Sequence, residues 1–225
     1  MKTKKLSDKQ AARLEFIHEP MDDYYRHPLI GIPSRIRVNK IFQELGKIRS
    51  KKLLDVGCEA GYITIQLAQK GALVTGIDLI EEPINQLRRD LSFQPKKIKQ
   101  RVRLQVADAT KLPFPTNSFD IILATEVIEH ITHLDRFVSG AARVLKPGGR
   151  LLVSFPNENL RQPLYPIVSL FGIKAEVEDQ VTLKNYLAEN IIRLFTKKFT
   201  LIKHYRLPWF LPITNLMLFK KPSLV

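Results

Sequence analysis

Apolar residues come in short runs along the middle of the chain, and amphipathic segments separate these runs. Five runs predict strands, at residues 52–57, 73–78, 101–108, 119–128 and 150–156. Three segments between them have helical spacing, at residues 61–71, 81–93 and 134–145. Strands that are apolar on both faces are typical of a parallel sheet with helices on its two sides. The pattern therefore predicts an α/β fold in which strands and helices alternate.

The beginning of the chain departs from this alternation. Residues 1–52 have the spacing of amphipathic helices, with Ile36, Ile41 and Leu45 along one face and Gly46 at a predicted stop. We therefore predict that this segment is an N-terminal helical cap that precedes the α/β domain.

The α/β domain is predicted to cover residues 53–225. An irregular apolar insert follows the fifth strand, at about residues 157–180, with Arg161 and Lys174 as basic neighbours. Beyond the insert the sequence predicts one helix and two strands, at residues 183–195, 199–205 and 215–222. A proline-rich loop with three large apolar side chains joins these last two strands.

Length and composition place few restrictions on the class of protein. The 225 residues are enough for one α/β domain, and their mean hydropathy of −0.11 is typical of a soluble globule. No apolar run reaches the ~20 residues of a membrane span, and the charged start has no secretory pattern, so we expect a cytoplasmic protein. The single cysteine, Cys58, excludes an internal disulfide and a cysteine-rich zinc site.

The formal net charge of +14 is high for a chain of this size. Such a charge attracts nucleic acid, acidic lipid headgroups or an anionic small molecule, although it also serves solubility alone. The densest basic run, at residues 94–103, contains no interleaved aromatic residues. It is therefore more typical of a solvated loop than of a platform on which bases stack.

The stretch DVGCEAG, from Asp55 to Gly61, follows the first predicted strand. Gly57 allows a tight backbone turn, and Gly61 allows the next helix to begin close to a ligand. The Asp55 carboxylate would repel the pyrophosphate of a dinucleotide, but it could organise hydrogen bonds around the ammonium group of an amino acid. The loop therefore favours S-adenosylmethionine over NAD, with a strand–turn–helix that binds no ligand as the alternative.

Two further acidic residues end the second and third predicted strands. Asp78 lies 21 residues after Gly57, a separation that suits hydrogen bonds to the two hydroxyls of a ribose. Capping of the next helix is the alternative for Asp78, and the two roles are compatible. Asp108 could accept from an adenine amino group, with the Ala109 amide at the ring edge, or it could form an Asx turn.

These motifs resemble those of the class I S-adenosylmethionine-dependent methyltransferases. The matching stretches are LLDVGCEAG, GIDL, ADATKLPFPTNSFDIILATEVIEHI and LKPGGRLLVSFPN, in the family's order over about residues 35–160. The resemblance implies a Rossmann-like seven-stranded sheet with its last strand antiparallel, and S-adenosyl-L-methionine at the carboxyl ends of the strands. It also implies that Cys58 and Leu79, within two of these motifs, contact the cofactor. The chain departs from the family at Glu59, where glycine is usual.

The segment HPLIGIPSRIRVNKI, upstream of the first motif, is similar to the start of the ubiquinone-pathway O-methyltransferases of the methyltransferase type 11 group. The resemblance implies that an arginine 18 residues before the motif aspartate contacts the carboxylate of the cofactor. Counting back from Asp55 gives Arg37. A guanidinium suits a bidentate contact with a carboxylate, whereas a solvated arginine on an N-terminal helix is the alternative.

Glu126, Glu129 and His130 follow the fourth predicted strand and could share one face of a helix. Such a set could hold a metal ion that activates a hydroxyl group for methylation. Because no histidine follows in residues 176–187, where the resemblance implies one more ligand, we predict no metal here. His130 is then the candidate general base, since an imidazole titrates near neutral pH, and both glutamates are assigned to the catalytic site with it.

These features together predict an S-adenosylmethionine-dependent methyltransferase (EC 2.1.1.-). The predicted acceptor is a small apolar, lipid-like or quinone-like molecule, methylated on oxygen by an SN2-like transfer. The alternatives are an RNA or tRNA methyltransferase that uses the basic surface, and a scaffold that binds the cofactor without catalysis. The apolar insert also leaves open a peripheral contact with a membrane surface.

Overall fold

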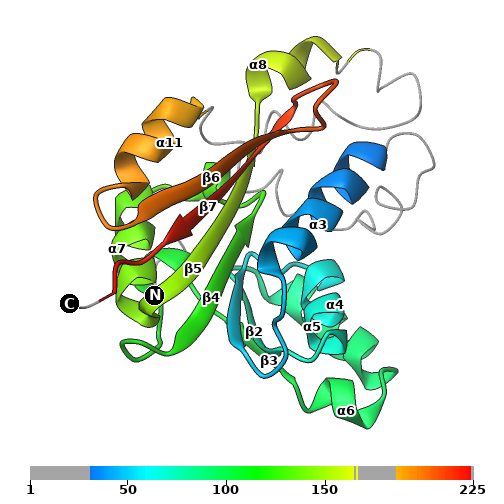
Figure 1. Cartoon of the computed structure of the whole chain (residues 1–225). Helices are drawn as coiled ribbons and strands as arrows, with labels where there is room; N and C mark the ends of the chain where they lie inside the picture. The colour runs from blue at the N-terminus through cyan, green and yellow to red at the C-terminus, as the bar shows by residue number, and fades with distance from the viewer. Residues whose placement is uncertain (1–30, 165, 167–185, 224–225) are drawn as a thin grey trace, which may run out of the picture.

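Seven strands form one sheet in the computed structural model, which describes residues 31–164, 166 and 186–223 (Figure 1). The strands are β1 (Lys52–Val56), β2 (Leu73–Asp78), β3 (Val102–Val106), β4 (Phe119–Thr125), β5 (Leu145–Pro156), β6 (Thr200–Leu207) and β7 (Thr214–Lys220). Their order across the sheet is β3-β2-β1-β4-β5-β7-β6. Only β7 runs antiparallel to its neighbours β5 and β6. The predicted Rossmann-like sheet with an antiparallel last strand is confirmed.

Helices cover both faces of this sheet. They are α3 (Ile32–Leu45), α4 (Tyr62–Gln69), α5 (Glu81–Ser92), α6 (Lys96–Lys99), α7 (Leu134–Val144), α8 (Glu158–Arg161) and α11 (Ala188–Phe195). Three 3-10 turns are η1 (Ala109–Lys111), η2 (Ile128–His130) and η3 (Gln162–Leu164). Helices α3 and α4 pack on one face, and α7 and α11 pack on the other.

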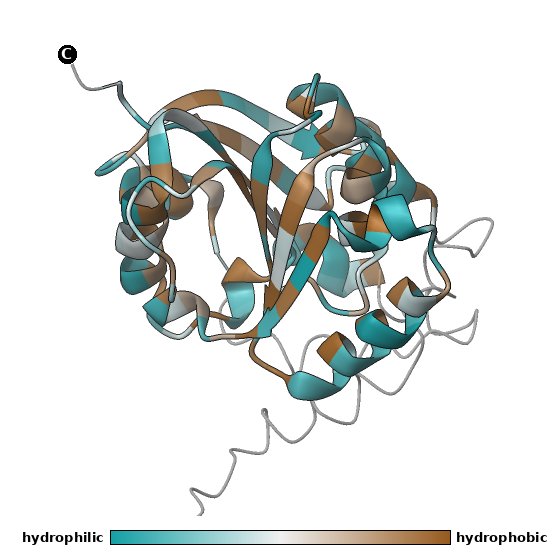
Figure 2. Ribbon diagram, turned by 90° about the horizontal axis from the view of Figure 1, so that it is seen from below, coloured by the Kyte–Doolittle hydropathy of each residue, from teal (hydrophilic) through white to brown (hydrophobic). Residues whose placement is uncertain are grey.

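The packing explains why the strands have continuous apolar runs. In β4, Ile121 and Leu123 face the α3 and α4 side, whereas Ile122 and Ala124 face the α7 and α11 side, and all four are buried. Successive side chains of a strand point to opposite faces, so a strand covered on both sides needs apolar residues at every position. Figure 2 shows mainly hydrophobic strands between helices that are hydrophilic on part of their surface.

Some predicted elements differ in extent from those of the structure. The helix expected over 183–195 begins only at Ala188, because Tyr186 and Leu187 precede it without helical backbone. The turn expected at residues 146–149 lies within β5, where the register with β4 shifts. Most of the expected apolar insert (residues 165 and 167–180) and residues 1–30 of the expected N-terminal cap lie outside the described residues.

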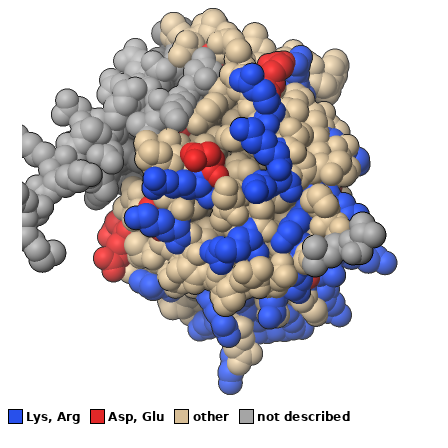
Figure 3. Space-filling model, turned by 90° about the vertical axis from the view of Figure 1, so that its left-hand side faces the viewer, with Lys and Arg blue, Asp and Glu red and all other residues tan. Residues whose placement is uncertain are grey.

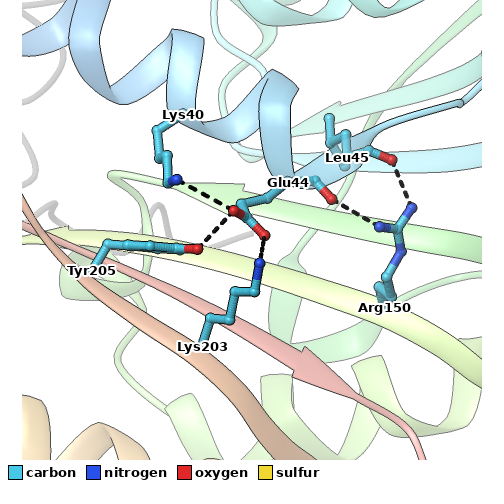
Figure 4. A network of polar contacts seen from close by, with 6 residues as sticks. All are labelled: Lys40, Glu44, Leu45, Arg150, Lys203 and Tyr205. Atoms are coloured by element: carbon cyan, nitrogen blue, oxygen red, sulfur yellow. Dashed lines mark hydrogen bonds and ion pairs between the residues drawn. The ribbon is translucent and has the colours of Figure 1, made fainter.

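A polar network fixes helix α3 on the sheet (Figure 4). The Glu44 carboxylate accepts hydrogen bonds from Tyr205 Oη at 2.7 Å and Lys203 Nζ at 3.0 Å, and Lys40 Nζ lies 3.4 Å away. The Arg150 guanidinium donates to the main-chain oxygens of Glu44 and Leu45, each at 2.8 Å. Partial burial acts to raise the pKa of Glu44, but hydrogen bonds from Tyr205 and the two lysines hold it below its ordinary value. These contacts set the position of the rest of α3 relative to the strand ends.

Candidate active site at the carboxyl end of the sheet

A cavity of about 270 Å³ lies where β1, β2 and β3 end. Its lining residues come from the loops after these strands and from the segment around η2: Val56, Gly57, Ile77, Asp78, Leu79, Ala107, Asp108, Ala109, Thr110, Val127, His130, Ile131, Thr132 and His133. Ligands of open α/β sheets bind outside the carboxyl ends of the strands, where the strand order reverses. In this sheet that reversal lies between β1 and β4, next to the cavity. The cavity is therefore the candidate cofactor site.

The loop after β1 adopts left-handed backbone at three positions, with φ of 69° at Gly57, 46° at Glu59 and 85° at Gly61. A Cβ atom at Gly57 would lie 2.5 Å from a methyl group of Val127, and a Cβ at Gly61 would overlap the side chain of Leu87. Gly57 lines the cavity, as predicted. Gly61 is not among the lining residues; its close approach is to Leu87 of α5, and the approach of its helix to a ligand stays a prediction.

Glu59 stands at a position where the backbone itself favours glycine. Its φ of 46° lies in the left-handed region, which costs a side-chain residue free energy that glycine does not pay. The Glu59 amide donates to Asp78 Oδ2 at 3.2 Å, which holds the strained loop against the end of β2. The side chain is exposed and is not among the lining residues of the cavity. Glutamate in place of the family's usual glycine therefore adds backbone strain to the loop, while the loop keeps its path.

Asp78 joins two loops at the cavity wall. Its Oδ1 accepts from the Ile80 amide at 3.1 Å, and its Oδ2 accepts from the Glu59 amide. The side chain is buried, yet it lines the cavity, and each carboxylate oxygen can accept more than one hydrogen bond. Both predicted roles are therefore geometrically compatible: Asp78 binds the backbone where α5 begins and still presents acceptors to a ligand.

Asp108 forms the Asx turn that was predicted as its alternative role. Its Oδ1 accepts from the amide of Thr110 at 2.7 Å and from the Thr110 hydroxyl at 2.8 Å. Asp108, Ala109 and Leu79 all line the cavity. The loops after β2 and β3 thus place three of the predicted cofactor residues in its wall.

Two of the predicted cofactor residues lie behind the wall instead. Asp55 is buried in β1, and its Oδ2 accepts from the Thr64 hydroxyl of α4 at 2.6 Å. Burial raises the pKa of Asp55 to about 6, against the hydrogen bond from Thr64 and with a smaller contribution from the charge of Asp78. Cys58 packs beside α5, and its burial, with the charges of nearby carboxylates, raises the pKa of the thiol well above its usual value. Neither residue is among those that line the cavity.

A second polar group lies at the ends of β4 and β5. Glu126 follows β4 with a φ of 51°, and its Oε1 accepts from the Ser154 hydroxyl at 2.8 Å. Its Oε2 lies 3.0 Å from Arg37 Nη1 and 3.8 Å from Arg161 Nη1, and Arg161 also lies 3.7 Å from Glu158 Oε1. Arg37 is buried, so it is not the solvated arginine that was its alternative. Ser154, Arg161 and Glu158 were not predicted as site residues.

The predicted common helix face of Glu126, Glu129 and His130 is wrong. Glu126 has left-handed backbone, and the segment after it forms only the 3-10 turn η2, so Glu126 lies outside any helix. His130 lines the cavity, whereas Glu129 is buried with no hydrogen-bond partner on its Oε2 among the described residues. Burial raises the pKa of Glu129 well above its usual value, and the charge of Glu126 adds to this. Within the described part of the chain, no group of three His, Cys, Asp or Glu side chains could hold a metal ion.

Comparison with known proteins relates this part of the chain to methyltransferases. A family model described as a methyltransferase domain matches residues 54–153, which contain every loop of the cavity described above. Residues 54–153 match a methyltransferase domain, and they lie on a sheet of the class I type. The cofactor of this domain is S-adenosylmethionine, and the cavity fits it: the described lining includes the carboxylates of Asp78 and Asp108 and no lysine or arginine that would bind a pyrophosphate.

The methyltransferase domain is similar to curated ubiquinone biosynthesis O-methyltransferases. The Coxiella burnetii protein is 34% identical over 133 residues, which are 59% of this chain and 55% of the relative. The mitochondrial protein of Mus musculus is 37% identical over 108 residues, 48% of this chain and 29% of the relative. The chain thus matches about half the length, or less, of these curated relatives.

Solved structures share the fold at lower identity. A methyltransferase of Methanosarcina mazei has a TM-score of 0.63 at 22% identity, covering 82% of this chain and 98% of that one. A protein described as the [4+2]-cyclase SpnF has a TM-score of 0.74 at 16% identity, covering 96% and 97%. Since one fold serves two reactions, the chemistry of this chain has to be argued from its site.

Proposed function

We propose that this chain transfers the methyl group of S-adenosylmethionine to a hydroxyl oxygen of a small apolar, quinone-like acceptor. The observation that carries the proposal is the position of His130, a side chain able to take up a proton near neutral pH, in the wall of the cofactor cavity. The likeness to ubiquinone biosynthesis O-methyltransferases, at 34% identity over 59% of the chain, supports the class of acceptor.

In this proposal the loops after β1, β2 and β3 hold the nucleoside part of the cofactor. Asp78 accepts from the ribose hydroxyls, Asp108 and the Ala109 amide meet the adenine, and Gly57 and Leu79 pack against them. Arg37 offers its guanidinium to the cofactor carboxylate while it keeps the 3.0 Å contact with Glu126, since a guanidinium has five N–H donors. When bound, the cofactor supplies an electrophilic methyl group on a sulfonium.

Toward the acceptor, His130, Glu126 and the apolar wall of the cavity have different roles. His130 takes the proton of the acceptor hydroxyl, which makes the oxygen a better nucleophile. Glu126, which bridges Ser154 and Arg37, positions the surroundings of His130. The apolar side chains of Val127 and Ile131 in the same wall exclude water and favour an apolar acceptor.

The decisive experiment identifies the acceptor. The full chain is incubated with S-adenosylmethionine labelled in its methyl group and either an organic-solvent extract of cells or total RNA. The proposal expects label in the organic phase, stable to mild base as an ether is. Label in RNA would assign a different acceptor, and bound cofactor without transfer to any fraction would refute methyl transfer.

A further inference from the structure

Two aromatic side chains project from the loop that joins β6 to β7, which we call the β6–β7 tip (residues 208–213). Trp209 is 86% exposed and Phe210 is 58% exposed, and their rings meet edge to face with centroids 5.7 Å apart. Large aromatic residues are normally buried, and an exposed pair of this kind marks an interaction site. The cofactor site does not use either residue.

The tip is held firmly behind these aromatic rings. Leu207 and Pro208 are buried, and the Leu211 amide donates to the Pro208 oxygen at 3.1 Å. Asn157, at the start of α8, donates its amide to Ile213 O at 2.7 Å and its side-chain nitrogen to Pro212 O at 3.2 Å. The loop therefore presents the two rings from a fixed base, and it lies beside α8 at the top of Figure 1.

The tip lies at the same end of the sheet as the cofactor cavity. Strand β6 runs parallel to β5, because both are antiparallel to β7, so its last residue lies at the carboxyl end. Exposed apolar side chains gather at this end. Of the ten large hydrophobic residues that are exposed in the described part of the chain, seven lie there: Ile32, Leu79, Val106, Leu160, Leu187, Trp209 and Phe210. The tip is the most exposed part of this apolar rim.

The charge of the surrounding chain indicates what the tip meets. No acidic residue occurs from residue 190 to residue 225, so the segments on both sides of the tip carry no negative side chain. Arg206 is exposed directly before the tip, and Lys203 lies lower on β6, where Glu44 partly neutralises it. Figure 3 shows that lysine and arginine predominate on the face of the molecule that carries α7 and α11. Aromatic residues beside cations suit the boundary of an anionic bilayer, where Trp is favoured and the surface is negative.

We propose that the β6–β7 tip docks on an anionic lipid bilayer, with Trp209 and Phe210 inserted at the level of the headgroups. The docking brings the cavity end of the sheet toward the membrane, and it is a peripheral contact. Within the described ranges no helix is long and apolar enough to cross a bilayer. The docking surface does not depend on which acceptor is methylated.

Trp209 is itself the reporter, because the chain has a single tryptophan. Its fluorescence is followed while the full chain is titrated with vesicles of phosphatidylcholine alone or of phosphatidylcholine and phosphatidylglycerol in equal parts. The proposal expects a blue shift with the anionic vesicles that is weaker with the neutral ones and falls as salt is added. Phe210→Ser, which keeps the reporter, should weaken the partition about tenfold or more, because the ring loses its burial in the interface.

Phe93→Ser is the matched control, since Phe93 is 85% exposed at the opposite end of the sheet beside the lysines of α6. It should leave the titration unchanged, and Trp209→Ser should abolish flotation with anionic vesicles. Absence of a blue shift, or equal losses in Phe93→Ser and Phe210→Ser, would overturn the proposal. A blue shift without vesicles that grows with protein concentration would overturn it in favour of self-association. Cofactor affinity, measured without vesicles, tests the proposed function separately and should be the same in all variants.

Discussion

Charged side chains at the two ends of the sheet differ in their burial and in their hydrogen-bond partners. At the carboxyl end lie all five buried charged residues of the described chain, namely Arg37, Asp55, Asp78, Glu129 and Glu158. At the amino end lies Asp120, the second residue of β4, which is partly exposed. Its carboxylate accepts hydrogen bonds from Lys146 Nζ and from the Lys52 amide, both at 2.8 Å. Partial burial acts to raise the pKa of Asp120, but these two hydrogen bonds and the charges of nearby lysines together hold it below its usual value.

Asp120 and Glu129 differ in whether the charged form of the carboxyl group stabilises the fold. The Asp120 carboxylate is more stable charged, because donors surround it. Burial makes the Glu129 carboxyl more stable neutral, and the charge of Glu126 reinforces this. A buried acid that costs stability is a candidate for function, whereas a paired surface acid is a candidate for stability. Substitutions at the two ends should therefore change different properties.

The largest effect is expected for His130→Ala, which should lower turnover about 10²-fold or more because the general base is removed. Cofactor affinity should change little. The measurement is the rate of transfer from labelled cofactor together with calorimetry of cofactor binding. His133→Ala is the matched control, since His133 lines the same cavity. Equal losses of turnover in both variants would contradict the assignment of His130 as the general base.

A somewhat smaller effect is expected for Asp78→Ala, measured by calorimetry with S-adenosylmethionine. The variant removes the ribose acceptors and the bond that holds the Glu59 amide, so the affinity should fall about 10- to 100-fold. Unchanged affinity would remove the ribose assignment. Asp120→Ala, at the other end of the sheet, should leave this affinity within about twofold.

Asp55→Asn tests how the buried charge of Asp55 affects the stability of the carboxyl end. The pKa of Asp55 is raised from 3.8 to about 6 in the folded chain, so its charged form destabilises the fold as pH rises from about 4 to about 6. The variant removes this charge and keeps an acceptor for Thr64. Relative to the parent it should therefore gain up to about 3 kcal/mol between pH 4 and pH 8. Denaturant unfolding at both pH values tests this, and an equal difference at the two would contradict it.

The smallest effect is expected for Asp120→Asn, at about 0.5–1 kcal/mol of unfolding free energy at pH 7. The pKa of Asp120 is lowered, so its contribution is present above the unfolded value near 4 and is lost as pH falls below it. Thermal unfolding at pH 7 and pH 3 should show the difference only at pH 7. A loss of cofactor binding in this variant would break the contrast between the two ends.

Local patterns predicted the strands and the residues that follow them. Asp78, Asp108 and Ala109 reach the cavity because the ends of adjacent parallel strands must lie together, which is a property of the fold class. The left-handed backbone at Glu59 could also have been predicted, since the family's glycine at that position signals a left-handed residue.

The second polar group was harder to predict, because its members come from distant segments. Arg37 and Glu126 are 89 positions apart, and nothing local couples them. The helix expected at Glu126 fails because that residue has left-handed backbone. Ser154 did carry a signal, being a polar residue inside the apolar run of the fifth strand, and a buried hydroxyl needs a partner.

The polar network at Glu44 also determines when helix α3 can pack in its final position during synthesis. Its partners Lys203 and Tyr205 follow it by 159 and 161 residues, and Arg150 follows it by 106. A ribosome must therefore synthesise the chain beyond Tyr205 before α3 can make all of these contacts. Arg37 is carried on the same helix, so its contact with Glu126 is among the last features to form. A nascent chain cut before β6 would have its nucleoside loops but no anchored α3.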